Sequence, residues 1–260
     1  MLARIALCMG LLATRLAAQD STSGFFKRRD IWWTAGAVAA SAALSAYDER
    51  IARWTRQASV QGDSSRRRNI EKVTVINEMP LTAGAVATYA VGRLTKSETV
   101  ADVGLHLTES LVVTEVISEV VRSGLGRARP RASQTDPYNF RPGRGVVQFE
   151  FRAFPSLHAA VAFATAATLS EEIRMRKPSA ARWALPLLYA AATIPGFTRL
   201  YLDQHWASDV LAGSFTGTLI GIRTTRYMHG HRTRLDRVLL GLRALPDLNG
   251  GALVYYSIPH

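Results

Sequence analysis

Residues 153–170 read AFPSLHAAVAFATAATLS, an alanine-rich run of 18 residues without a charged side chain. Ser156 is a good helix N-cap, so we expect a helix to begin directly after it. The N–H groups of a first helical turn lack partners within the helix and point toward any anion in front of it. His158 falls in that turn, so the stretch predicts an apolar helix whose polar head suits an anion.

Further uncharged runs lie on both sides of this stretch. They cover residues 31–47, 79–92, 183–198 and 210–222. Residues 99–123 show helical spacing of apolar side chains broken by acids, which is typical of an amphipathic helix. Residues 130–150 have no period and contain prolines and glycines, so we expect a long loop there. We therefore predict an all-α fold, a helical bundle of about six helices, with a short β-like C-terminal tail at residues 252–256.

The composition leaves two environments open for such a bundle. The chain has 260 residues, 32 Lys+Arg against 20 Asp+Glu, 48% hydrophobic residues and a mean hydropathy of +0.03. This apolar content excludes a disordered polar chain, and the single Cys8 excludes a disulfide scaffold or a cysteine-based zinc site. No uncharged run reaches the roughly 20 residues of an ideal membrane span. We favour a membrane-embedded bundle over a soluble one, because apolar runs alternate with basic segments.

The first residues have the pattern of an export signal. Arg4 supplies a positive start, an apolar run follows, and Leu16-Ala17-Ala18 is a candidate cleavage site. An uncleaved N-terminal anchor is the alternative. The expected organisation is a signal peptide over residues 1–18, an N-terminal helix and polar linker over 25–78, a helical-bundle domain over 79–228, and a basic tail with a short strand over 229–260.

Two more segments hold polar side chains that a plain helical bundle does not need. Arg122 and Arg129 lie seven positions apart, nearly two helical turns, so we expect them on one face of a helix that ends near Pro130. Two guanidinium groups there would form a clamp for a phosphate or a carboxylate. By itself the pair is also explained as a basic helix end that satisfies its own dipole.

The other polar segment contains a histidine and an acid. His205 and Asp209 are four positions apart, so we expect them on one helix face. The carboxylate would accept a hydrogen bond from one imidazole nitrogen and leave the other as a nucleophile or base. Arg199 adds a third cation able to bind phosphate. Taken alone, the pair of His205 and Asp209 is also explained as a contact on the protein surface. The turn around His158 is likewise explained as a capped helix with a partly buried histidine.

Together, the three segments form a specific pattern: Arg122-x6-Arg129-Pro130, Pro155-Ser156-x-His158 and Arg199-x5-His205-x3-Asp209. In order and spacing, this pattern resembles the signature of the type 2 phosphatidic acid phosphatase superfamily. That superfamily also includes bacterial non-specific acid phosphatases and vanadium haloperoxidases. The signature spans residues 122–209, and the likeness of the surrounding bundle extends to roughly residues 80–225.

The resemblance implies a fold and a mechanism. The fold is an all-α bundle, with six spans in the membrane branch and a site facing away from the cytoplasm. His205 would attack phosphorus to form a phosphohistidine, Asp209 would orient its ring, and His158 would protonate the leaving oxygen and later activate water. The groups that would hold the phosphate belong to Arg122, Arg129, Ser156, Leu157 and Arg199. Arginines and a helix N-terminus can supply this charge without a metal or another cofactor.

Three positions depart from the family pattern. Arg122 stands where lysine is usual, Leu157 where glycine is usual, and Thr198 where serine is usual. The exchange at position 157 matters most, because its Cβ excludes a positive φ angle and is expected to crowd the pocket. The phosphate ester that the site accepts is therefore left open.

The expected function is metal-independent hydrolysis of phosphate monoesters or diphosphates, most of all lipid-linked ones. The expected location is the bacterial inner membrane with a periplasm-facing site. A soluble periplasmic acid phosphatase of broad specificity is the second interpretation, and a vanadium haloperoxidase is disfavoured by the chain length. From another class, the chain could be a non-catalytic basic protein that binds membranes.

Two further interpretations concern nucleic acid and metal. Nucleic acid is not expected as a partner, because DNA binding gives no reason to align His158, His205 and Asp209. His229 and His231 have no partner cluster nearby in the sequence, so we interpret them as a polar helix end rather than a metal site.

Overall fold

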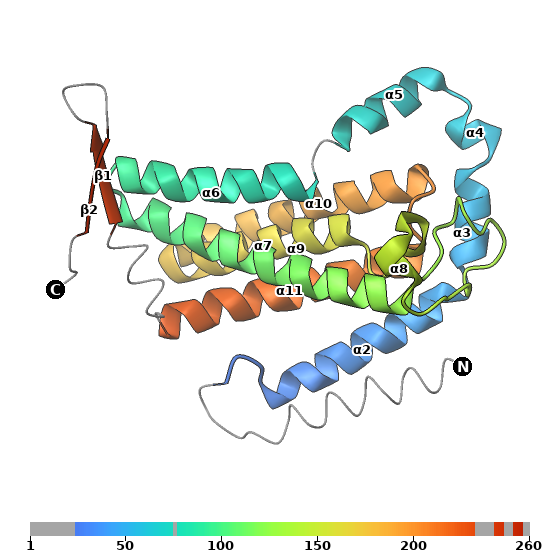
Figure 1. The fold of residues 1–260 in the computed structure, drawn as a ribbon, viewed down its shortest axis with the longest axis horizontal. Helices are drawn as coiled ribbons and strands as arrows, with labels where there is room; N and C mark the ends of the chain where they lie inside the picture. Colours follow the sequence, from blue (N-terminus) through green and yellow to red (C-terminus); the bar gives the residue numbers. More distant parts are fainter. Residues whose placement is uncertain (1–23, 75–76, 232–241, 247–251, 257–260) are drawn as a thin grey trace.

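The computed structural model describes residues 24–74, 77–231, 242–246 and 252–256. The expected signal peptide over residues 1–18, with Cys8, lies outside the described residues, as does much of the basic tail. Within the described residues, six helices of 17 residues or more form the body of the molecule (Figure 1). They are α2 (Arg28–Ser45), α6 (Glu78–Leu94), α7 (Glu98–Leu125), α9 (Leu157–Arg176), α10 (Pro178–Tyr201) and α11 (Ala207–Gly230).

Shorter helices gather at one end of the bundle (Figure 1). They are α3 (Asp48–Thr55), α4 (Ala58–Gln61), α5 (Ser64–Val73), α8 (Arg144–Val147) and the 3-10 turn η1 (Phe149–Phe151). The expected loop over residues 130–150 therefore contains two short helical turns. At the opposite end, β1 (Leu242–Pro246) and β2 (Ala252–Tyr256) pair as an antiparallel hairpin, with Leu242 opposite Tyr256.

Helix α9 packs against α6, α7, α10 and α11. Its contact with α11 is close because three glycines, Gly213, Gly217 and Gly221, recur at every fourth residue of α11 and face α9. A Cβ on Gly217 would lie 1.9 Å from the carbonyl oxygen of Ala160, a distance that no side chain tolerates. The two helices therefore approach backbone to backbone, which places their N-terminal ends side by side.

The segment expected to be a polar linker is instead helical from α3 to α5. The side chain of Asp63 caps α5 by accepting hydrogen bonds from the N–H groups of Ser65 and Arg66. Polar contacts hold the segment to the bundle: Arg56 Nε donates to Asp203 Oδ2 at 2.9 Å, and its terminal nitrogens donate to backbone carbonyls of residues 130 and 134. An expectation based on apolar runs misses this segment because it has no long apolar run, and its single residue in a core cluster is Ala52, which packs with Ala153 and Trp206.

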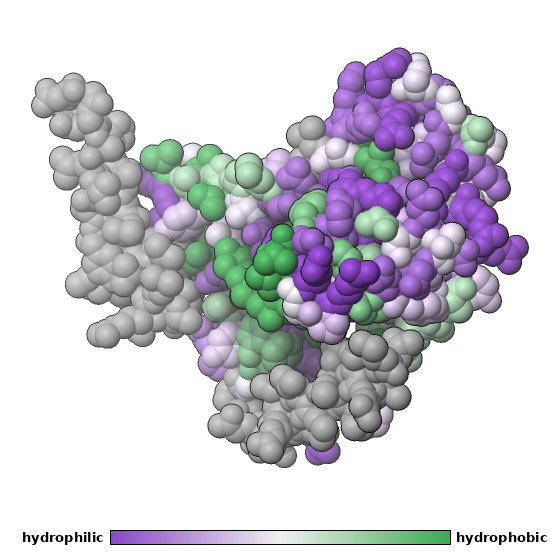
Figure 2. All heavy atoms as spheres, turned by 45° about the vertical axis from the view of Figure 1, so that its right-hand side comes forward, coloured by the Kyte–Doolittle hydropathy of each residue, from purple (hydrophilic) through white to green (hydrophobic). Residues whose placement is uncertain are grey.

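In the described part of the chain, no helix is both long enough and apolar enough to cross a bilayer. Large hydrophobic side chains are exposed on several helices, among them Trp32, Trp33, Val116, Val120, Trp183, Leu187 and Phe197. Figure 2 shows hydrophobic side chains gathered in the middle of one face, next to a strongly hydrophilic end. The expectation of a membrane-embedded bundle stays a prediction.

Candidate active site

The polar residues singled out in the sequence meet at one end of the bundle, although they come from three separate segments. Arg122 lies in the last turn of α7, His158 in the first turn of α9, and Arg199 in the last turn of α10. His205 directly precedes the N-cap of α11, and its ring centroid lies 6.3 Å from that of His158. The charges of Arg122, Arg129 and Arg199 all act on His158, so the three guanidinium groups lie near this ring.

The arginine pair does not share a helix face, contrary to the expectation. Helix α7 ends at Leu125, because Gly126 adopts a left-handed conformation with φ of 60° and donates its N–H to the carbonyl of Arg122. Arg129 therefore follows the helix in an extended segment, where its N–H donates to the carbonyl of Glu150 at 2.8 Å. A Cβ on Gly126 would lie 1.9 Å from the carbonyl oxygen of Arg141, so this turn requires glycine.

Most of the predicted site residues carry a buried polar atom without a hydrogen-bond partner among the described residues. These atoms are Nε of Arg129 and Arg199, Oγ of Ser156, Nδ1 of His158 and Nε2 of His205, whereas Nε of Arg122 has only an ion pair with Oε2 of Glu119 at 3.3 Å. Such atoms are rare in folded proteins, since each costs about 1–3 kcal/mol unless a partner binds it. The guanidinium and hydroxyl groups suit an anion with several acceptor oxygens.

Burial raises the free-energy cost of keeping the three arginine side chains charged when no anion is bound. Desolvation, together with the charge of Arg122, lowers the pKa of Arg129 to about 9, and desolvation also lowers the pKa values of Arg122 and Arg199. The Arg129 guanidinium carbon lies 3.9 Å from the centroid of the Phe149 ring, and one terminal nitrogen donates to Gln204 Oε1 at 2.8 Å. These contacts hold the guanidinium in place, and a bound anion would offset its cost of burial.

His205 is oriented by the backbone rather than by a helical pairing with Asp209. Its Nδ1 donates to the carbonyl of Ala153 at 2.7 Å, while Asp209 Oδ2 lies farther away at 3.7 Å. The expectation of one shared helix face is wrong, because α11 begins only at Ala207. With the proton held on Nδ1, Nε2 keeps its lone pair. Burial lowers the pKa of His205 to about 4, so the ring is neutral at pH 7.

Asp209 belongs to a buried charge network that sequence reasoning missed. Arg127 donates to Asp209 Oδ1 at 2.5 Å and to Asp48 Oδ2 at 2.8 Å. Burial opposes ionisation of Asp209, but the Arg127 guanidinium, the His205 ring and the N–H of Trp206 together outweigh it, so the pKa of Asp209 lies below its ordinary value. Asp48 also accepts hydrogen bonds from the N–H and Oγ of Ser208. Asp48 begins α3, far from the motifs in sequence, and no spacing pattern points to it.

We expect Asp48→Asn to lower kcat by about 10- to 100-fold, the effect commonly seen when a support of a site residue is removed. The amide can no longer balance Arg127, which would shift relative to Asp209. Steady-state kinetics on the purified variant measures the effect. Asp30→Asn is the matched control, because Asp30 forms a similarly buried pair with Arg223 away from this network. Equal kcat values in the two variants would contradict a positioning role for Asp48.

His158 faces a carboxylate that the sequence patterns also missed. Its Nε2 lies 3.4 Å from Oε2 of Glu78, the first residue of α6, and its Nδ1 has no hydrogen-bond partner among the described residues. Burial, followed by the charge of Arg199, lowers the pKa of His158 to about 2. A phosphate dianion bound among the arginines would reverse this effect and favour a protonated ring.

Both histidines are expected to make the free protein less stable in weak acid. The unfolded chain protonates them near pH 6.5, whereas the folded protein resists protonation of His205 down to a pKa of about 4 and of His158 further still. Between these values the unfolded chain binds more protons, so the free energy of unfolding falls as the pH falls.

Thermal melts at pH 7 and pH 5 measure this dependence. We expect a lower Tm at pH 5, with a smaller difference in His158→Gln and in wild type with inorganic phosphate. An identical pH dependence in the wild type and the variant would count against the assignment to His158.

The head of α9 has the expected N-cap position but an unexpected side-chain arrangement. Ser156 is the N-cap residue, yet its Oγ makes no capping hydrogen bond and has no hydrogen-bond partner in the described part of the chain. Leu157 packs in a buried cluster with Leu107, Leu111 and Val161. The expected crowding of the pocket by Leu157 is therefore wrong, because its side chain points into the core and only its backbone remains at the head of the helix.

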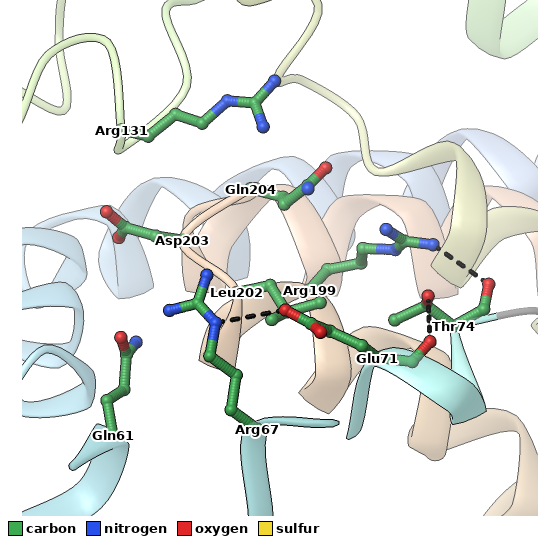
Figure 3. A pocket seen from close by; sticks show the side chains of 9 residues that line it. All are labelled: Gln61, Arg67, Glu71, Thr74, Arg131, Arg199, Leu202, Asp203 and Gln204. Atoms are coloured by element: carbon green, nitrogen blue, oxygen red, sulfur yellow. Dashed lines mark hydrogen bonds and ion pairs between the residues drawn. The ribbon is translucent and has the colours of Figure 1, made fainter. Parts of the chain in front are cut away.

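A cavity of about 460 Å³ adjoins the arginines (Figure 3). Arg199 forms part of its wall, Arg67 and Glu71 of α5 lie on one side, and Arg131 lies on the other. Arg67 pairs with Glu71 at 3.1 Å, and Arg199 donates to the carbonyl of Thr74. The lining is thus largely polar and charged, which suits a hydrophilic ligand.

Three comparisons place this geometry among known proteins. Residues 103–233, half of the chain, match the family described as the PAP2 superfamily. A lipid A 1-phosphatase from Porphyromonas gingivalis is 39% identical over 69 residues, which are 26% of this chain and 15% of that protein. The chain thus matches only a small part of that relative's length.

A solved structure shares the fold. It is a transmembrane PAP2-type phosphatidylglycerolphosphate phosphatase from Bacillus subtilis, with a TM-score of 0.56 and 19% identity over 78% of this chain and 100% of that chain. The resemblance drawn from the motif spacing is confirmed, and the family match contains all eight predicted site residues but neither Asp48 nor Glu78. The chain belongs to the PAP2 superfamily, whose phosphatases are phosphoric ester hydrolases.

Proposed function

We propose that this protein hydrolyses phosphate monoesters or diphosphates of lipid-linked substrates through a phosphohistidine on His205, without a metal at the reacting centre. One observation carries the proposal most strongly: buried polar atoms of Arg129, Arg199, Ser156 and His205 have no hydrogen-bond partner among the described residues, and the His205 ring lies 6.3 Å from that of His158. Phosphoryl transfer depends mainly on positioning and on charge stabilisation, which these groups supply.

In the first step, the lone pair of His205 Nε2 attacks phosphorus. A P–N bond forms while the P–O bond to the leaving group breaks, and His158 donates a proton to the departing oxygen. The arginines and the N–H groups at the head of α9 hold the remaining phosphate oxygens. Positive charge grows on the His205 ring, where the Ala153 carbonyl and the ionised Asp209 stabilise it.

In the second step, water hydrolyses the intermediate. His158, now neutral, accepts a proton from the water as its oxygen attacks phosphorus, the P–N bond breaks, and inorganic phosphate leaves. Glu78 Oε2 lies near Nε2 of His158, so it favours the protonated ring that the first step needs. The same histidine thus serves first as an acid and then as a base.

Two observations support a lipid-linked substrate at a membrane. The two relatives are, by their names, phosphatases of lipid A and of phosphatidylglycerolphosphate. Exposed hydrophobic side chains, including Trp32, Trp183 and Phe197, would suit contact with the interface of a bilayer. We propose action at the bacterial inner membrane with the site toward the periplasm.

A soluble periplasmic acid phosphatase of broad specificity is the second candidate, because the cavity beside Arg199 is largely polar and charged. Fractionation of cells that express the full chain separates the two. Retention in the membrane fraction until detergent is added is expected for the lipid phosphatase. Release by osmotic shock alone would favour the soluble enzyme.

The substrate class is tested with the purified full chain in mild detergent. Phosphate release is measured on a lipid monophosphate, a lipid diphosphate and a water-soluble monoester, each with and without EDTA. We expect the highest kcat/KM on a lipid substrate and the same initial rate with EDTA. Loss of the initial rate with EDTA, or no release from any substrate by folded protein, would overturn the proposal.

A further inference from the structure

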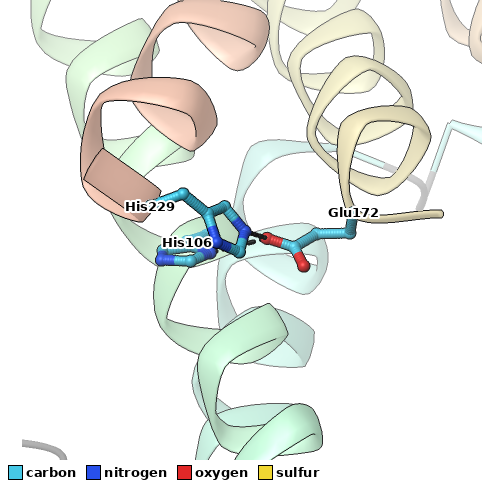
Figure 4. A group of neighbouring side chains, drawn as sticks. All are labelled: His106, Glu172 and His229. Carbon is cyan, nitrogen blue, oxygen red and sulfur yellow. Dashed lines mark hydrogen bonds and ion pairs between the residues drawn. The ribbon is translucent and has the colours of Figure 1, made fainter. Parts of the chain in front are cut away.

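A second cluster of histidines and acids lies at the other end of the three helices that build the active site. His106 of α7, Glu172 of α9 and His229 of α11 point toward one another (Figure 4). Along α9, Glu172 lies 14 residues beyond His158, about 21 Å at 1.5 Å per residue. The cluster is therefore separate from the phosphate site and has no part in the proposed reaction.

The three side chains converge on one point. His106 Nδ1 lies 2.6 Å and His229 Nε2 lies 2.8 Å from the same oxygen, Oε1 of Glu172, and the three atoms all lie within 4.8 Å of one another. Two imidazole nitrogens and a carboxylate oxygen are a common ligand set of zinc and of other divalent transition metals. We propose that His106, Glu172 and His229 bind such an ion, zinc above all, and that the ion fastens α7, α9 and α11 together.

The surroundings of the cluster favour a cation. Helices α9 and α11 both end here, at Arg176 and Gly230, so the negative ends of two helix dipoles face the site. Arg176 donates to the other carboxylate oxygen of Glu172 at 2.7 Å and also to Asp102. The arginine thereby orients the carboxylate and leaves Oε1 for the ion, as the outer partners of metal ligands commonly do.

The burial pattern leaves room for water as a further ligand. His106 and Glu172 are buried, whereas the His229 side chain is 27% exposed. Zinc–ligand bonds of about 2.0–2.1 Å place neighbouring ligand atoms of a tetrahedral site slightly more than 3 Å apart. A small opening of the two contacts, by rotation of the partly exposed His229, would therefore admit the ion. Each imidazole would bind the ion through the lone pair of the nitrogen that now faces Glu172, with its proton on the other ring nitrogen.

Sequence reasoning interpreted His229 as part of a polar helix end without a partner cluster. The structure supplies those partners from α7 and α9, which lie 123 and 57 positions earlier in the chain. His231, two residues beyond His229, takes no part in the cluster and stacks on Tyr227 instead. It therefore provides a matched control.

The experiment uses the untagged full chain, stripped with EDTA, dialysed and titrated with zinc by calorimetry and thermal melting. We expect one zinc ion per chain and a rise in Tm of about 5–10 °C at zinc 100-fold above Kd. His229→Ala should abolish both the heat of binding and the rise, and His231→Ala should keep them. Cobalt should give the visible absorption of a tetrahedral site in wild type and in His231→Ala only.

Three outcomes would overturn the proposal. The wild-type protein could show neither zinc binding nor a rise in Tm, and the three residues would then form a hydrogen-bonded cluster that binds no metal. His229→Ala could retain the site, or His231→Ala could lose it, which would place the ion elsewhere. Zinc bound at His158 and His205 would survive His229→Ala and would inhibit phosphate release, so it is distinguishable from the proposed site.

Discussion

His205→Ala is expected to lower phosphate release by at least about 10⁴-fold, the scale on which removal of a covalent nucleophile acts. Nε2 of His205 is a buried nitrogen with a lone pair and, among the residues that the structure describes, no hydrogen-bond partner. Neither His158 nor the arginines can replace it, because each has a separate role in the reaction. Inorganic phosphate released at saturating substrate measures the loss.

The control for this variant addresses folding. The His205 side chain is fully buried, so alanine leaves a cavity, and His205→Gln tests the same loss with a smaller change of volume. Both variants should keep the helical circular-dichroism spectrum and bind vanadate or phosphate through the arginines. A folded His205→Gln protein with wild-type turnover would refute the assignment of the nucleophile.

His158→Gln is expected to have an effect that depends on the leaving group. An alkyl phosphate needs a proton on its departing oxygen, so we expect a loss of about 10²- to 10⁴-fold in the phosphorylation step. A p-nitrophenolate leaves without a proton, so the same variant should form the phosphoenzyme nearly as fast as wild type. Pre-steady-state release of the two alcohols measures this contrast.

Equal losses on both esters would show that His158 is needed only for the fold or for binding. Glu78→Gln provides a further comparison, because it weakens the support of the protonated ring but keeps the side-chain volume. Its loss should follow the same order of leaving groups and be smaller. This graded pattern is not expected from a general loss of stability.

Much of the fold followed from the sequence because apolar periodicity reports directly on helices. The uncharged runs over residues 79–92, 157–170 and 210–222 lie in α6, α9 and α11, as predicted. The segment from α3 to α5 was not predicted, because it has no long apolar run and polar contacts such as that of Arg56 with Asp203 contribute to its attachment. The pattern of hydropathy along the sequence does not reveal polar contacts between distant residues.

The predicted site residues were found through fixed local spacing, and the errors arose where local geometry departs from a helix. The glycine at position 126 ends α7 before Arg129, although Pro130 suggested a later end. The helix that contains Asp209 begins after His205, so a carbonyl and not the acid fixes the ring. Leu157 turns inward and packs in the core between α7 and α9.

Partners that lie far apart in the sequence could not be predicted from one chain. Asp48 meets Arg127 across 79 positions, and His106 meets Glu172 across 66. Neither pair has a characteristic spacing, since the contacts depend on how whole helices pack. These residues are also the ones on which the positioning and metal proposals rest.

A covalent phosphohistidine on His205 is the central claim, and chemical trapping tests it most directly. The His158→Gln protein is mixed with radioactive p-nitrophenyl phosphate, because this variant forms the intermediate but hydrolyses it slowly, and is then quenched in alkali. The account predicts one label per chain, stable in alkali and lost in acid, on the peptide that contains His205. Release of p-nitrophenol without any label, or a label on another residue, would contradict it.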